Sequence, residues 1–284
     1  MRRSTFTPEG RPSPATAFVF DSLSEVSAFI SAGVDVVRSS WGLTRLARER
    51  LLTGDASLVD RSSALLDRIE AASPLADVRV ETVRVVAGGA ADVPAYLAGS
   101  PVAMRQRRRR SAPAPLRIVV DVTSSASVDD ATLERRGVAT LALLRLLEAA
   151  GHAVELWIAH GIGEGSQTGL TLVRLDTQPL DLARAVWALA SSQASRECLF
   201  TTSNSAAECA AGGWPWQNVR WNGHPAVQRS VWASVLGVDP GNVLLLPGVF
   251  TRDGATPYTS DAQAAQWVAS TYAEAVSPAP EAVA

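Results

Sequence analysis

Residues 116–127 read LRIVVDVTSSAS, an apolar run that ends in one carboxylate and continues into hydroxyl side chains. The segment Ile118-Val119-Val120 is short and β-branched, which is typical of a strand covered by helices on both faces of a sheet. Asp121 follows at the carboxyl end of this predicted strand, where open parallel sheets bind their ligands. Thr123 and Ser125 come next at alternate positions. We therefore expect their hydroxyls to converge with the carboxylate of Asp121.

A long helix is predicted directly after this stretch. Asp129 or Asp130 is a suitable N-cap, and Gly151 marks the end of the helix. Between them, apolar residues recur at roughly helical spacing: Leu133, Val138, Leu141, Leu144 and Leu147. Strand and helix patterns then alternate to residue 276, with strands predicted over 152–159, 170–175, 198–204 and 243–246. Such alternation predicts an α/β protein with a doubly wound, mostly parallel sheet, in which 170–175 is an antiparallel edge strand.

The order Asp121-x-Thr123-x-Ser125 at a strand end resembles the metal-ion-dependent adhesion site of von Willebrand factor A domains, which usually reads Asp-x-Ser-x-Ser. The resemblance covers residues 116–276. It implies one Mg²⁺ ion held by these three side chains, by a later Thr and by a later Asp. Thr177 is the best match for the Thr, whereas residues 201–204, Thr-Thr-Ser-Asn, occupy the place of the Asp. Mg²⁺ prefers hard oxygen ligands, so a carboxylate from a partner would be needed to complete the implied site.

The chain before this domain divides by composition. Residues 1–16 are predicted to be a disordered lead, 17–104 a helical α+β N-terminal domain, 105–115 an Arg/Pro-rich linker, and 277–284 a disordered tail. Within the N-terminal domain, Ser22-x-x-Glu25 is a capping box that starts a helix. Residues 78–85 mostly alternate apolar with polar side chains, which indicates a half-exposed antiparallel strand.

Several short signatures resemble an uncharacterised family encoded by tailed bacteriophages and their hosts. They lie between residues 18 and 160: FDSL at 20–23, WG at 41–42, YLAGSPVAM at 96–104, RG at 136–137 and LLEAAGH at 146–152. The resemblance implies a phage or prophage origin and no particular activity.

The composition limits which binding partners and which cellular compartment are expected for this protein. The net charge of −2 gives no global attraction to nucleic acid or to an acidic membrane. Cys198 and Cys209 are too few for a disulfide framework or a cysteine zinc site, which favours free thiols. No apolar run reaches membrane-spanning length, and the first residues do not read as a signal peptide. We therefore expect a cytoplasmic protein with no membrane partner, located in the host cytoplasm or the virion if it is phage-encoded.

Two further segments carry residues that often bind partners. Arg105 and the run Arg107 to Arg110 place five arginines within six residues, which suits phosphate. No aromatic residue interrupts them and prolines follow, so a solvated linker is the alternative. Trp214, Trp216 and Trp221 are either core residues or a partner-binding surface.

Three functions remain open from sequence. The first is a non-catalytic interaction or structural module that binds a protein partner at the carboxyl edge of the sheet, with Mg²⁺ as candidate ion and Asp121, Thr123, Ser125 and Thr177 as ligands. The second is a metal-assisted hydrolase that uses Asp121 with Asp176 or Asp181. The third is a phage structural protein whose arginine run contacts nucleic acid. The sequence has no Walker loop, no Gly-x-Ser-x-Gly elbow and no His-Glu-x-x-His motif.

Overall fold

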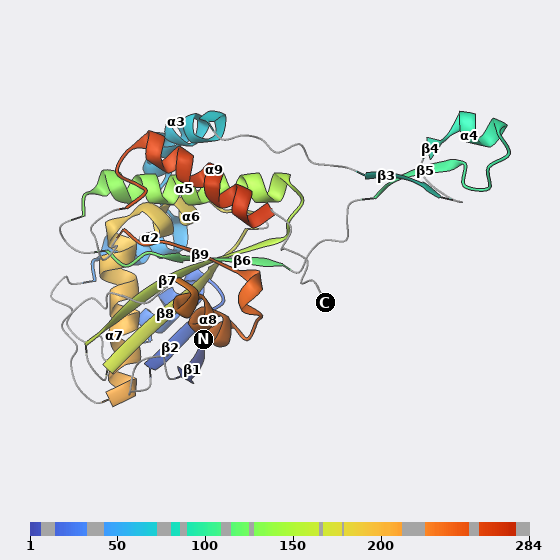
Figure 1. The fold of residues 1–284 in the computed structure, drawn as a ribbon. Coiled ribbons are helices and arrows are strands. Elements are labelled where there is room, and N and C mark those ends of the chain that lie inside the picture. Colours follow the sequence, from blue (N-terminus) through green and yellow to red (C-terminus); the bar gives the residue numbers. More distant parts are fainter. Residues whose placement is uncertain are drawn as a thin grey trace.

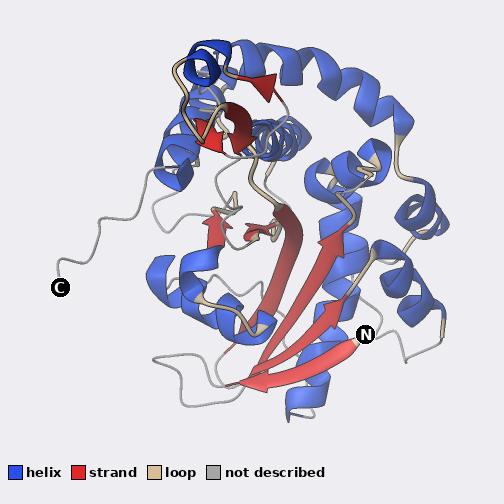
Figure 2. Cartoon of the chain, turned by 90° about the vertical axis from the view of Figure 1, so that its right-hand side faces the viewer, coloured by secondary structure: helices blue, strands red, loops and turns tan. Residues whose placement is uncertain are grey.

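The computed structural model describes residues 1–6, 15–32, 43–72, 81–85, 90–108, 115–124, 128–164, 167–177, 179–211, 225–249 and 256–276. Their main element is a six-stranded mixed sheet, covered by helices on both faces (Figure 1). Its strand order is β1 (Arg2–Phe6), β2 (Ala15–Phe20), β8 (Gln167–Leu175), β7 (Val154–Glu164), β6 (Leu116–Asp121) and β9 (Val243–Leu246). Figure 2 shows these strands side by side and twisted.

Most of the strand pairings are parallel. β6 is parallel to both of its neighbours, β7 and β9, and β2 is parallel to β8. The pairs β1–β2 and β7–β8 are antiparallel. The predicted α/β class with a mostly parallel sheet is thus confirmed. Strand β8 is antiparallel to β7 as predicted, but the predicted edge position is wrong, because β8 lies inside the sheet between β7 and β2.

The two faces of the sheet carry alternate residues of each strand. Ile118 and Val120 face a large core, to which the following helices also contribute: α1 (Leu23–Ser31), α2 (Arg45–Thr53), α3 (Ala56–Ala72), α5 (Asp130–Ala149), α6 (Leu182–Ala190) and α9 (Asp261–Val276). Val119 faces the other core, together with residues of α8 (Pro225–Leu236). Because both faces are covered, all three residues of the β-branched run are fully buried, which is why they are apolar without alternation.

The helix after β6 begins and ends where its sequence signals lie. The side chain of Asp129 accepts a hydrogen bond from the Thr132 N–H at 2.7 Å, so Asp129 is the N-cap. Gly151 adopts a φ of +89° just after the last turn, a conformation that favours glycine.

The predicted separate N-terminal domain is wrong for residues 15–72. Strand β2 pairs with β8 inside the main sheet, and Phe18, Leu51 and Ile69 belong to the same core as Ile118. Residues 2–6, predicted to be part of a disordered lead, form the edge strand β1. The reason is that β2 joins a strand about 150 residues away in the sequence, and local composition carries no information about such a pairing. The predicted tail, 277–284, lies outside the described residues.

A second, three-stranded sheet lies between α3 and β6 in the sequence. It contains β3 (Glu81–Val85), β4 (Ala90–Ala91) and β5 (Met104–Arg108) in the order β3-β5-β4, with α4 (Val93–Leu97) between β4 and β5. Both pairings are antiparallel, which confirms the strand predicted within 78–85. Figure 1 shows this element standing away from the main sheet, and we call residues 81–108 the arm. The predicted linker is wrong at residues 105–108, because these arginine-rich residues form the central strand of the arm.

The predicted strand over 198–204 is also wrong. A π-helix, η1 (Ala194–Leu199), runs directly into α7 (Phe200–Ala211). Residues 201–205 are five buried polar side chains. The hydroxyls of Thr201, Thr202 and Ser205 donate to carbonyls three or four residues earlier, within the helix. The Ser203 hydroxyl donates to the His160 carbonyl on β7 instead.

Candidate functional site at the carboxyl end of β6

Asp121 lies at the carboxyl end of β6, the interior strand between β7 and the edge strand β9. Strands β7 and β9 flank β6, and both follow it in the sequence, so the connections after β6 run to opposite sides. This arrangement is a topological switch point, where α/β sheets bind ligands. The Oδ1 atom accepts the Thr123 N–H at 2.9 Å. Gly248, just after β9, lies so close that a Cβ atom there would be 3.0 Å from Oδ2 of Asp121. The two loops therefore meet at this carboxylate.

The residues after Asp121 anchor this loop to its neighbours. The hydroxyl of Thr123 accepts the Gly161 N–H at 3.2 Å, which ties the loop to β7. The Ser124 hydroxyl lies 3.0 Å from that of Ser195 in the π-helix η1. Both side chains are buried. Ser125, the third predicted ligand, lies outside the described residues.

A buried cation, Arg136 of α5, lies within electrostatic range of Asp121. Its side chain has no exposed surface, and its Nε and Nη2 atoms donate to the Leu189 carbonyl at 3.1 and 2.6 Å. Its Nη1 atom has no hydrogen-bond partner among the described residues. Burial lowers the pKa of Arg136 to about 10, while the nearby Tyr258 and Asp121 oppose that shift. Sequence reasoning missed this residue, although an arginine inside a leucine-rich helix next to Gly137 was the available signal.

Burial also controls the ionisation of Asp121. Removal from water raises the pKa of its carboxyl group, and the hydrogen bonds from Thr123 and the charge of Arg136 only partly offset the rise. A nearby guanidinium also opposes the binding of a second cation. The described residues bring only Asp121 and Thr123 of the predicted Mg²⁺ ligands together, and they include no group of three or more His, Cys, Asp or Glu side chains suited to a metal. The described donors by themselves therefore do not fit Mg²⁺.

Thr177 lies at the opposite end of the sheet from Asp121. Its hydroxyl donates to the Val154 carbonyl at 3.3 Å, and Val154 pairs with Leu116, the first residue of β6. That position is about 16 Å from Asp121 at the usual rise per strand residue. The prediction of Thr177 as an ion ligand is therefore wrong, because the antiparallel direction of β8 carries the following turn to the amino end of β6.

The same geometry contradicts the predicted hydrolase. Asp176 and Asp181 flank Thr177, so neither approaches Asp121. Asp181 is the N-cap of α6, where it accepts the Arg184 N–H at 3.1 Å. This role fully explains a carboxylate at that position.

A buried polar cluster lies beside the site, between the sheet and α7. His160 Nδ1 lies 3.0 Å from the Ser203 hydroxyl, which in turn lies 2.9 Å from that of Thr171. The Thr171 hydroxyl is 2.9 Å from that of Thr202. Burial, together with the charge of Arg136, lowers the pKa of His160 to about 3, so this imidazole is neutral at physiological pH.

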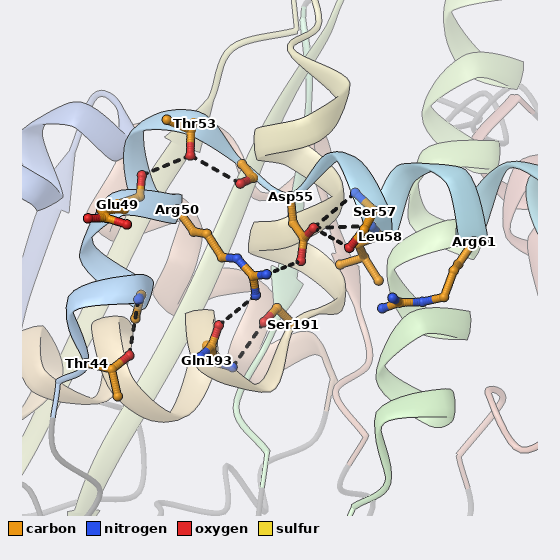
Figure 3. Close-up of polar contacts among 12 residues, drawn as sticks. Thr44, Glu49, Arg50, Thr53, Asp55, Ser57, Leu58, Arg61, Ser191 and Gln193 are labelled. Atoms are coloured by element: carbon orange, nitrogen blue, oxygen red, sulfur yellow. Dashed lines mark hydrogen bonds and ion pairs between the residues drawn. The ribbon is translucent and has the colours of Figure 1, made fainter.

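A second polar cluster fixes the N-terminal helices against α6 and η1 (Figure 3). Arg50 pairs with Asp55 at 3.0 Å and donates to the Gln193 side chain at 3.0 Å. Asp55 also accepts bonds from the N–H and hydroxyl of Ser57 and from the Leu58 N–H. Glu197, within η1, accepts the N–H and hydroxyl of Thr44 at 2.9 and 2.7 Å. The π-helix therefore touches both the site loop and α2, and π-helical turns are frequent at functional sites.

The other predicted site residues fall outside this edge. Arg105, Arg107 and Arg108 lie in β5 of the arm. The remaining five lie outside the described residues: Arg109, Arg110, Trp214, Trp216 and Trp221.

These features define an α/β protein whose mostly parallel sheet carries polar side chains at its switch point. Within that class the chain belongs to the family described as Domain of unknown function (DUF7192), whose model matches residues 40–243. The match includes α3, the arm and β6, and so runs across the predicted domain boundary. No curated protein and no solved structure matches the chain. In the described part of the chain, no helix is both long enough and apolar enough to cross a membrane.

Binding of Mg²⁺ to the isolated protein is expected to be undetectable below millimolar concentrations. Asp121 and Thr123 supply only two oxygen ligands, and the buried guanidinium of Arg136 is nearby. Water would therefore have to supply most of the six ligands that Mg²⁺ needs. Titration calorimetry with Mg²⁺ and with Mn²⁺ measures this directly. Saturable submillimolar binding that disappears in Asp121→Asn would contradict it and would mean that further ligands join Asp121 and Thr123.

Proposed function

We propose that this protein is a non-catalytic interaction module that binds a protein partner at the carboxyl edge of its main sheet, around Asp121 and Thr123. A phage or prophage origin is part of the same proposal and would place the complex in the infected cell or the virion. An ion that bridges the two proteins would need oxygen ligands from the partner, because the described residues of this chain supply only two.

The observation that carries the proposal is that the carboxylate of Asp121 lies where the surrounding protein disfavours its charged form. The surrounding protein raises the pKa of the Asp121 carboxyl group by keeping water away from it, so the charged form of this side chain costs stability. An asparagine would accept the same Thr123 N–H without that cost. Side chains with strongly shifted pKa values cluster at functional sites. Such residues are kept for binding although another residue at the same position would make the protein more stable.

The position of Asp121 also suits recognition rather than catalysis. Its neighbour Thr123 is tied to β7, and His160, which follows the residue paired with Asp121 on β7, is neutral and already bonded to Ser203. A base or nucleophile needs a free partner within hydrogen-bonding reach. Among the described residues, Asp121 has no such partner and is instead a hydrogen-bond acceptor held in place by the Thr123 N–H.

The Asp121→Asn variant tests this function. It is expected to lose capture of the wild-type partner from host lysate while its melting temperature at pH 7.5 stays equal or rises, since the variant removes a partly buried carboxyl group whose charged form is disfavoured. Thr177→Val is the matched control, because Thr177 lies at the other end of the sheet and should leave capture unchanged. Equal capture by Asp121→Asn and wild type would place the partner surface elsewhere.

A further inference from the structure

Helix α4 of the arm turns its apolar side chains outward. Val93, Tyr96 and Leu97 lie at i, i+3 and i+4, on one face of the helix, and are 57%, 72% and 78% exposed. Ala95, on the opposite face, is buried. Surface helices normally bury their apolar face, so an exposed one indicates a binding surface.

The scaffold holds this face in one conformation. Asp92 is buried, and its carboxylate accepts the Ala95 N–H at 3.3 Å as the N-cap. Its own N–H donates to the Ala103 carbonyl at 2.8 Å, which joins the start of α4 to the residue before β5. The Ser100 N–H donates to the Ala95 carbonyl at 3.0 Å, and Gly99 has a φ of +72° that lets the chain turn there. A surface ordered in this way loses little conformational entropy on binding.

Positive charge is concentrated in the same segment. Residues 81–110 contain six arginines and two acidic residues, a net charge of +4. Because the whole chain has a net charge of −2, the other residues carry −6. In the small sheet, Arg84 pairs directly with Arg105. This register places two of the six arginines at paired backbone positions, so positive charge is concentrated within the small sheet.

The fold also brings an aromatic residue to the arginine strand. Strand β4 pairs with β5 at Ala90–Arg105 and Ala91–Met104, and α4 begins two residues later. The helix that carries Tyr96 thus begins beside β5, where the Asp92 N–H donates to the Ala103 carbonyl, although no aromatic residue interrupts the arginine run in the sequence. Arginines beside an exposed aromatic ring are what proteins use to bind single strands, in which phosphates meet the cations and bases stack on the ring.

We propose that the arm binds single-stranded nucleic acid, with Tyr96 stacking on a base and the arginines of β5 neutralising phosphates. Acidic residues dominate the rest of the chain, so they would repel the polyanion and confine it to the arm. The arm stands away from the main sheet, which leaves its surface accessible to a strand (Figure 1). This site is separate from the edge around Asp121.

Fluorescence anisotropy with a labelled oligo(dT) of about 20 nucleotides tests the proposal on the full-length protein. Wild type is expected to bind at low salt, with an affinity that falls steeply as salt rises. Tyr96→Ala should weaken binding about tenfold, whereas Tyr96→Phe should stay within about twofold because the ring remains. Arg107→Gln with Arg108→Gln should reduce the slope of log K against log[salt] by about 0.7 for each phosphate that is no longer neutralised.

Matched controls separate stacking from general attraction. Leu52→Ala changes an exposed apolar side chain on α2, outside the arm, and should bind like wild type. A duplex of the same length should bind more weakly than the single strand, since its bases are not free to stack. Absence of binding at low salt would overturn the proposal in favour of a protein partner for α4. Equal affinity of Tyr96→Ala and wild type, or of duplex and single strand, would also overturn it.

Discussion

Gly54→Ala is expected to lower the free energy of unfolding by more than about 4 kcal/mol, the largest effect of any single substitution that we propose. Gly54 follows α2 with a φ of +69°, where a side chain costs about 1–2 kcal/mol. A Cβ atom there would also lie 2.3 Å from the carbonyl carbon of Ala183 and 2.4 Å from the nitrogen of Arg184. Both are backbone atoms of the α6 region, so the clash requires that the helices move apart.

Gly237→Ala is the matched control for this prediction. Gly237 has the same φ of +69°, but nothing lies within 4 Å of its Cβ position, so only the conformational term of about 1–2 kcal/mol applies. Urea unfolding of both variants measures the difference. Equal losses would mean that the α2–α3 turn is not packed on α6 and would restore the predicted independent N-terminal domain.

The polar contacts around Gly54 show why this turn has to be close to α6. The Asp55 N–H donates to the Ala183 carbonyl at 3.3 Å, and Asp55 pairs with Arg50, which reaches Gln193 beyond α6 (Figure 3). Any larger residue at position 54 would pull Asp55 away from these partners. In the sequence, Thr53-Gly54-Asp55 indicates only the end of a helix. The packing that makes this glycine irreplaceable involves a helix about 130 residues later.

Local signals were sufficient for the central strand and its helix. The β-branched run predicted β6, the position of Asp121 at its end, and the helix capped by Asp129. These features depend on residues within about one or two turns of each other, which is why they can be predicted from sequence. The same holds for the antiparallel strand β3 in the arm.

Features that depend on distant residues were missed or wrong. The ligand role of Thr177 failed because strand direction, and not the spacing of residues, decides which end of the sheet a turn occupies. The strand predicted from Cys198-Leu199-Phe200 is wrong because a short apolar segment has no distinct period. Three of the buried hydroxyls that follow, those of Thr201, Thr202 and Ser205, bond within the helix. Arg136 was missed because only the fold shows that an arginine in α5 is buried next to Asp121.

Acidification from pH 7 to pH 4 is expected to remove about 3 kcal/mol of stability through His160 alone. In the folded protein, burial beside Arg136 lowers the pKa of this histidine from 6.5 to about 3. In the unfolded chain the imidazole becomes protonated as the pH falls below about 6.5, whereas the folded state cannot take up that proton until about pH 3. The contribution of His160 is therefore fully present above pH 6.5 and is lost progressively between pH 6.5 and 3.

His160→Asn removes the titrating group and keeps a polar side chain opposite Ser203, whose hydroxyl lies 3.0 Å from Nδ1 in the native protein. The variant is expected to be less stable at pH 7, because the smaller side chain leaves space in the core, but to lose less stability on acidification than wild type. Urea unfolding at pH 7, 6, 5 and 4 gives, for each protein, the slope of the free energy of unfolding against pH. His152→Asn, at a partly exposed histidine after α5, is the control and should keep the wild-type slope. A His160→Asn slope equal to that of wild type would assign the acid loss to carboxylates and would mean that His160 is reached by water in the folded protein.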